Sequence, residues 1–154
     1  MNATIQPPAA RGRPLLPVCG VVSLLDKDED QVLRMVDEGD LLWAWDVALQ
    51  PERARRKELR VLPECVEDHL AGRKCRLEWP DVLGLILPHD RTVLETGEIE
   101  RPLNVSGTHV FALARRRCLK VARKGRVGPG GSMRVTAFSF VQFLKARRYP
   151  FAGD

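Results

Sequence analysis

The sequence lacks most of the features that would assign it to an extracellular, membrane or metal-binding class. Only four cysteines occur in 154 residues, and no two of them have the C-x-x-C spacing of common zinc and thiol-redox motifs. No apolar run approaches the roughly 20 residues of a membrane-spanning helix. No apolar segment of the kind found in secretion signals follows the N-terminus. We therefore expect a cytoplasmic protein with no membrane partner.

Patterns that support catalysis are also scarce. The sequence has three histidines, no glycine-rich phosphate motif that opens a helix, and no nucleophile at a known spacing from a base. It also has no paired carboxylates in a plausible cleft. His89 lies in the turn Pro88-His89-Asp90 and is interpreted as a loop histidine. We expect neither an enzymatic activity nor a cofactor.

One group of candidate metal ligands remains. Cys65, His69 and Cys75 lie close together in the sequence, and the spacing of Cys65 and His69 places them on one helix face. A zinc site is one interpretation, and a set of buried free thiols is the other. Because buried thiols are the usual state of cysteine in a reducing compartment, we expect no metal.

Charge is the first positive signal. The chain has 25 Lys and Arg against 20 Asp and Glu, which gives a net charge of +5. This excess favours an acidic partner such as nucleic acid, although only modestly because acidic residues are also plentiful.

The strongest local signal lies in residues 103–144. Ser106 is a good N-cap, because its hydroxyl can accept a hydrogen bond from a free amide of the first helical turn. Val110, Leu113 and Ala114 then recur at helical spacing, and three arginines follow at residues 115–117. This pattern predicts a helix with an apolar inner side and a small or basic outer side.

A hairpin and a last helix follow this basic helix. The run Gly128-Pro129-Gly130-Gly131 predicts a turn between two short alternating segments. Thr136 can cap a helix whose inner side carries Phe140 and Leu144. The predicted order is therefore helix, basic helix, β-wing, helix.

The run Leu103-Asn104-Val105-Ser106-Gly107-Thr108-His109-Val110 resembles the L-x-V-S-x-x-T-V run of the MerR and excisionase family. Proteins of that family are winged helix-turn-helix DNA-binding proteins. His109 stands where the family usually has Thr. The resemblance implies binding of double-stranded DNA, with the basic helix in the major groove. The alternative is a helical surface element with a solvated basic face.

The first part of the chain repeats this order. A shift of 78 positions places Asp28 on Ser106 and Val32 on Val110, and after the hairpin a shift of 74 places Val66 on Phe140. We interpret this as an internal duplication.

The predicted fold is α+β and mainly helical, with two tandem winged helix-turn-helix units that carry β-hairpin wings. The predicted parts are a flexible N-terminal arm (1–17), a first unit (18–76), an apolar connector (77–95), a second unit (96–149) and a tail (150–154).

The two predicted units differ in charge. Acidic residues dominate the first recognition-helix region, whereas the second region has seven Lys or Arg and no acid. The second unit is therefore the predicted DNA reader. The first unit either touches DNA through its basic wing, which we favour, or binds a protein partner or a second copy of the chain. The residues predicted to contact DNA are Ser106, Thr108, His109, Ala112, Arg115, Arg116, Lys120, Lys124, Arg126, Arg134, Arg53, Arg55, Arg56, Lys57, Arg11 and Arg13.

Arg11 and Arg13 enter this set through a second resemblance. The tetrapeptide Arg11-Gly12-Arg13-Pro14 is similar to the core of an AT-hook, which places two arginines along the minor groove. The flanking residues are apolar rather than basic, and the alternative is a proline-rich tail.

The sequence therefore predicts a sequence-specific, nucleoid-associated DNA-binding protein, acting as a transcriptional regulator or as an architectural factor of the excisionase kind. The rival prediction is an adaptor that uses winged-helix folds for protein contacts within a phage or mobile-element complex.

Overall fold

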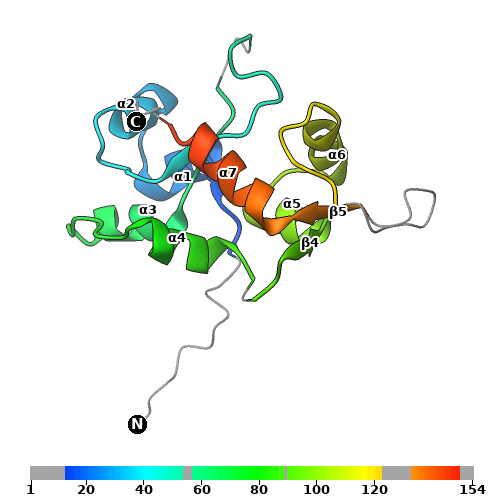
Figure 1. The fold of residues 1–154 in the computed structure, drawn as a ribbon. Helices are drawn as coiled ribbons and strands as arrows, with labels where there is room; N and C mark the ends of the chain where they lie inside the picture. Colours follow the sequence, from blue (N-terminus) through cyan, green and yellow to red (C-terminus); the bar gives the residue numbers. More distant parts are fainter. Residues whose placement is uncertain (1–12, 54–56, 89, 123–132, 150–154) are drawn as a thin grey trace.

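The computed structural model describes residues 13–53, 57–88, 90–122 and 133–149. These residues form seven helices and two small antiparallel sheets, which confirms the predicted α+β class (Figure 1). None of the helices in these ranges is long and apolar enough to cross a bilayer. The strands are β1 (Leu16–Pro17), β2 (Ala44–Asp46), β3 (Leu59–Val61), β4 (Val93–Glu95) and β5 (Arg134–Thr136). The helices are α1 (Val18–Leu25), α2 (Glu29–Asp37), α3 (Pro63–Leu70), α4 (Trp79–Ile86), α5 (Gly97–Leu103), α6 (Gly107–Arg115) and α7 (Ala137–Arg147).

The first sheet has the strand order β1-β3-β2, and it belongs to residues 13–76, which we call the first half. Leu16 of β1 pairs with Val61 of β3, and Leu15 is fully buried. Residues 13–17 therefore belong to the packed structure, whereas the sequence predicts a flexible arm as far as Pro17. The sequence places this segment in the arm because a two-residue strand has no periodicity of its own.

The second sheet pairs β4 with β5 and belongs to residues 93–149, which we call the second half. Leu94 lies opposite Val135, and an isolated bridge joins Val121 to the same Val135. The predicted connector extends to residue 95, but β4 already belongs to this sheet. The glycine-rich turn predicted at residues 128–131 lies outside the described residues.

Three helices begin at the caps that the sequence predicts. The Asp28 carboxylate accepts from the Gln31 amide, and the Gln31 side chain accepts in return from the Asp28 amide. The Ser106 hydroxyl accepts from the His109 amide, and the Thr136 hydroxyl accepts from the Ser139 amide. Each cap satisfies an amide that has no partner within its own helix, so the start of each helix is determined locally.

The same order of elements occurs in both halves: strand, two helices, then a hairpin strand and a last helix. The backbone repeats the predicted shift of 78 positions, because Asp26 and Asn104 both end a helix with φ 55°. Gly39 (φ 84°) and Arg117 (φ 64°) form a second pair of left-handed residues 78 positions apart. Each lies just after the second helix of its half.

Several polar contacts join the two halves. The Arg60 guanidinium of β3 donates to the carbonyls of Leu103 and Asn104 at the end of α5, at 3.0 and 3.1 Å. At the other end of the chain, the Tyr149 amide donates to the Ala44 carbonyl of β2 at 2.8 Å. Helix α7 thus runs from the second half to the edge of the first sheet (Figure 1).

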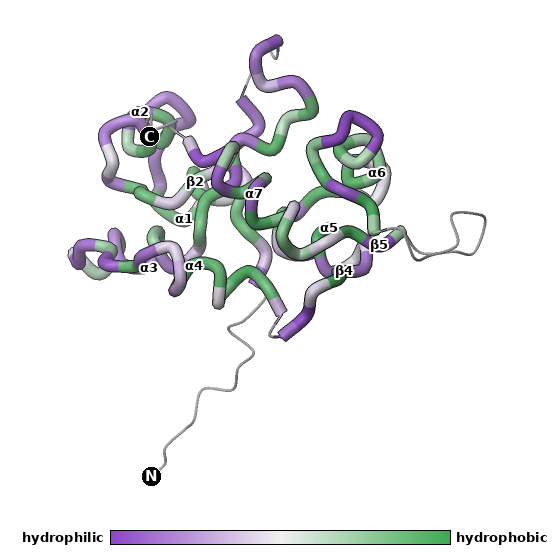
Figure 2. Tube along the Cα trace, viewed as in Figure 1, coloured by the Kyte–Doolittle hydropathy of each residue, from purple (hydrophilic) through white to green (hydrophobic). Residues whose placement is uncertain are grey.

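The core is continuous across both halves. Trp45 of β2 and Phe140 of α7 are both fully buried. Helix α4 of the connector adds Trp79, which meets Trp43 edge-on at a centroid distance of 4.9 Å. Apolar residues follow β2 and α7 through the middle of the molecule, and hydrophilic residues follow the outer turns of α2 and α6 (Figure 2).

Candidate nucleic-acid interface

Helix α6 and the turn after it form a basic surface. The sequence has no acidic residue from Ser106 to Ala122. Val110 and Leu113 are fully buried, and this fixes the opposite side of α6 toward solvent. The exposed cations of this surface are Arg115, Arg116, Arg117 and Lys120, and β5 adds the exposed Arg134. Within the described residues, none of these five side chains forms an ion pair.

Other cations of the chain are occupied by neighbouring groups. Arg73 pairs with Asp68 at 3.2 Å, and Arg91 pairs with Glu98 at 3.0 Å. Arg147 donates to the backbone carbonyls of Asp46 and Ala48. The unpaired cations on α6, its turn and β5 can therefore bind an external anion without losing an internal partner.

The structure fixes which side of α6 is open. His109 Nε2 lies 2.6 Å from the Val47 carbonyl oxygen, and its side chain is only 17% exposed. His109 is predicted to face DNA, but this edge of the helix meets the first half instead. Ala112, one turn further along, is half-buried. The contact between the two halves therefore determines which side of α6 faces solvent.

The open face of α6 carries Thr108, Phe111 and Arg115, which follow one another at helical spacing of three and four residues. Phe111 is 46% exposed in the middle of this face. The predicted contact residues do not include Phe111, although its spacing from Thr108 and Arg115 is a signal that would have found it. Ser106 is exposed as well, and its hydroxyl is used by the cap.

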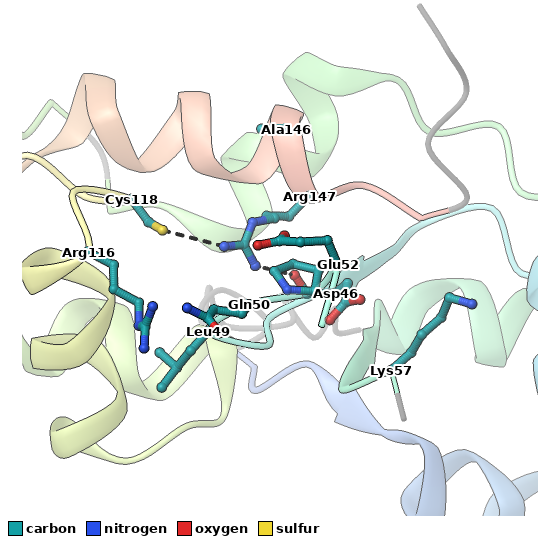
Figure 3. A pocket seen from close by; sticks show the side chains of 10 residues that line it. Asp46, Leu49, Gln50, Glu52, Lys57, Arg116, Cys118, Ala146 and Arg147 are labelled. Carbon is teal, nitrogen blue, oxygen red and sulfur yellow. Dashed lines mark hydrogen bonds between the residues drawn. The ribbon is translucent and has the colours of Figure 1, made fainter. Parts of the chain in front are cut away.

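Residues of the first hairpin lie against the end of α6. They share with it an open pocket of about 490 Å³, in which Arg116 and Lys57 lie on opposite sides and the Arg147 guanidinium lies between them (Figure 3). The residues lining this pocket are Asp46, Leu49, Gln50, Pro51, Glu52, Lys57, Arg116, Cys118, Ala146 and Arg147. A neighbouring pocket of about 480 Å³ has Arg53, His109 and Arg116 in its wall. The fold thus brings predicted contact residues of both halves together.

Lys57 interacts with Tyr149, and this interaction favours its charged form. Its ammonium lies 4.7 Å from the centre of the Tyr149 ring. A hydrogen bond to Tyr149 raises the pKa of Lys57, and burial opposes this effect. The side chain remains exposed, so Lys57 presents a positive charge at the rim of the pocket.

Arg13 occupies a different position from the one that an AT-hook requires. Its guanidinium donates to both oxygens of Glu67, at 2.8 and 3.1 Å, and lies 3.1 Å from Glu64. We leave Arg13 out of the interface because two carboxylates already neutralise it. Five other predicted contact residues lie outside the described residues: Arg11, Arg55, Arg56, Lys124 and Arg126.

The candidate metal ligands do not assemble. Within the described ranges, no group of three or more His, Cys, Asp and Glu side chains is arranged to hold a metal ion. Cys65 and Cys75 do come together, with their sulfur atoms 3.4 Å apart.

Comparisons with protein-family models, with curated proteins and with solved structures find no match to the chain.

Proposed function

We propose that the chain is a sequence-specific DNA-binding protein made of two tandem winged helix-turn-helix units, of which the second is the main reader. The order of elements supports two such units, because each half has a strand and a helix pair, followed by at least one further strand and a closing helix. The turn predicted for the second wing lies outside the described residues.

One observation carries the proposal. The end of α6, its following turn and β5 expose five cations that have no acidic partner among the described residues, on a surface without a single acid from residue 106 to 122. Duplex DNA carries about one negative charge per 1.7 Å of axis, so such a surface is attracted to it at long range. An α-helix fits the major groove of B-form DNA, and one face of α6 is exposed.

We assign separate roles to the residues on the open face of α6. Arg115 can reach O6 and N7 of a guanine, which is the commonest specific contact of arginine in the major groove. Phe111 lies one turn earlier and offers an apolar surface to a thymine methyl group. Arg116 and Lys57, at the rim of the shared pocket, and Arg134 on β5 hold phosphates. The first half thus supports the reader through its hairpin.

Salt dependence tests the DNA proposal most directly. The affinity for duplex DNA should fall with a log–log slope near −0.9 per neutralised phosphate, and a reader of this size contacts about 4–8 phosphates. Fluorescence anisotropy of a labelled random duplex at five salt concentrations measures this slope. A slope indistinguishable from zero would exclude DNA as the partner.

Single substitutions then separate base reading from phosphate binding. On a site selected from random DNA, Arg115→Ala should cost about 1–3 kcal/mol and relax the preference at one base. Arg134→Ala should weaken all sequences about equally and reduce the salt slope by about one. Arg34→Ala is the matched control, because Arg34 is exposed on α2, outside the proposed interface. Equal effects of the three substitutions would contradict the assignment of α6 as the reader.

The acidic surface of α2 favours a second function, in which the first unit binds a protein partner. Glu29, Asp30, Asp37 and Glu38 are all exposed on this helix or at its end. If α2 lies outside the groove, Asp30→Lys should raise the affinity for random DNA without changing the site preference. Loss of the selected site in Asp30→Lys, with Arg115→Ala silent, would instead make the first unit the reader.

A further inference from the structure

Cys65 and Cys75 form a pair of thiols that the proposed DNA binding does not use. Cys65 lies in α3 and is 1% exposed, whereas Cys75 is half-buried in the irregular segment between α3 and α4. Their sulfur atoms are 3.4 Å apart, so they are in contact. The distance in a disulfide is about 2 Å, and Cys75 lies on a segment without helix or sheet hydrogen bonds that would hold it in place.

A positive charge lies close to both thiols. Arg148 is held nearby, because its guanidinium donates to the Leu42 carbonyl at 3.0 Å and lies 3.7 Å from the centre of the Trp43 ring. Burial lowers the pKa of Arg148, and the negative charges of ionised Cys65 and Cys75 act in the opposite direction.

The two thiols differ in their access to solvent. Burial raises the pKa of the Cys65 thiol, and its contact with Cys75 raises it further. Cys65 is thus held as a neutral thiol out of reach of solutes, and Cys75 is the thiol that a small oxidant can reach. This is the arrangement of an attacked cysteine with a resolving cysteine beside it.

We propose that Cys65 and Cys75 are an oxidation site that closes to an intramolecular disulfide when a small peroxide reacts with the chain. The Cys75 thiolate attacks a peroxide oxygen and becomes a sulfenic acid, while the peroxide O–O bond breaks and hydroxide leaves. The Cys65 sulfur then attacks the Cys75 sulfur, its proton joins the departing hydroxyl, and water is released. Two thiols and one hydrogen peroxide thus give one disulfide and two waters.

The disulfide would tie the segment after α3 to α3 itself. A cross-link over ten residues restricts the unfolded chain and leaves the packing of α3 unchanged. The midpoint of thermal unfolding should therefore rise by about 5–10 °C on oxidation. The pair lies in the first half, away from the exposed face of α6, so the slope of DNA binding against salt should stay unchanged.

The test is oxidation of the full chain with a small excess of hydrogen peroxide, followed by alkylation, proteolysis and mass spectrometry. We expect a peptide pair that joins Cys65 to Cys75 and has lost two hydrogen atoms, and two of the four thiols should remain free. Dithiothreitol should restore all four. Cys75→Ala should remove both the linked peptides and the shift in the thermal midpoint.

Cys118→Ala is the matched control, because Cys118 is half-buried like Cys75 but contacts Arg147 rather than a second thiol. It should leave the linked peptides and the shift intact. Recovery of alkylated Cys65 after Cys75 has been oxidised to the sulfinic acid would overturn the proposal. Linkage through the exposed Cys19 to a second copy of the chain, without a Cys65–Cys75 peptide, would overturn it as well.

Discussion

Arg13 shows how two carboxylates can take a basic side chain out of a predicted nucleic-acid surface. It lies in the Arg-Gly-Arg-Pro run, and yet its guanidinium makes two hydrogen bonds to Glu67. The hydrogen bond from Arg13 is the main cause that lowers the pKa of Glu67, and burial opposes it only in part. A charged residue can therefore be assigned to a partner only when its neighbours in space are known.

The Arg13–Glu67 pair should stabilise the chain in a pH-dependent way. Because the folded pKa of Glu67 is lowered, the stabilisation is present above the ordinary glutamate pKa of about 4.3 and is lost as the pH falls through the folded value. Glu67 is 56% exposed, so Arg13→Gln should lower the free energy of unfolding by only about 0.2–1 kcal/mol at pH 7. Urea unfolding at pH 7 and at successively lower pH measures this, and the difference between Arg13→Gln and the unmodified chain should shrink as Glu67 becomes protonated. A difference that does not change with pH would show that Arg13 acts through packing.

Arg117 has a left-handed backbone (φ 64°) where the first half has Gly39. A left-handed conformation costs an L-residue about 1–2 kcal/mol, whereas glycine adopts it freely. Arg117→Gly should thus raise the free energy of unfolding by about 0.5–1 kcal/mol and reduce the salt slope of DNA binding by about one. Arg117→Ala separates the two effects, since it removes the charge and keeps the strain. Denaturant unfolding and anisotropy titrations measure both quantities, and an Arg117→Gly variant with an unchanged slope would place Arg117 outside the interface.

At the scale of elements, α7 holds the second half together. Phe140 is fully buried, and Leu144 lies fully buried one turn further along. Phe140→Ala should lower the free energy of unfolding by about 3–5 kcal/mol, because it removes a buried aromatic ring and leaves a cavity. Phe138→Ala is the control on the same helix, since Phe138 is 73% exposed and its loss should change the free energy by less than about 0.5 kcal/mol. Equal effects in denaturant unfolding would contradict the packing of α7.

The helices could be predicted more fully than the strands. Asp28, Ser106 and Thr136 begin their helices through contacts within three residues, so the chain encodes these starts locally. The strands β1 and β4 have two and three residues, and their partners lie about forty positions away, so no local pattern marks them.

The candidate interface could be predicted only in part for the same reason. The basic character of α6 is evident from the sequence, and the predicted contact residues Thr108 and Arg115 are exposed on its open face. The contact between His109 and the Val47 carbonyl depends on how the two halves dock, which requires residues 62 positions apart to meet. That contact turns one edge of α6 inward and leaves Phe111 on the face that remains open.

At the scale of the whole molecule, the two halves should unfold together. All three tryptophans lie in the first 79 residues, so their fluorescence reports mainly on the first half and its connector, whereas far-ultraviolet circular dichroism reports on helices of both halves. Because Arg147 and Arg148 fasten α7 to backbone carbonyls of the first half, the two signals should change at the same urea concentration.

Removing the hydrogen bonds of Arg147 and Arg148 to the first half should separate the fluorescence transition from the circular dichroism transition. Arg148→Ala should lower the free energy of unfolding by about 1.5–3 kcal/mol, since a charged hydrogen bond to a carbonyl is lost, and the combined loss of Arg147 and Arg148 should split the transition. Lys145→Ala is the control, because Lys145 is exposed on the same helix. Two separate transitions in the unmodified chain would contradict this account of the junction.

The contact of Tyr149 with β2 also bears on how the chain folds during its synthesis. Arg148 donates to the Leu42 carbonyl across 106 positions of the sequence, and Tyr149 pairs next to it with Ala44. A ribosome releases the first half long before residues 148 and 149, so the edge strand β2 stays open while the second half is translated. Contacts between such distant positions slow folding, and an open sheet edge can pair with other chains. The emerging chain is therefore most exposed to aggregation before its last helix is complete.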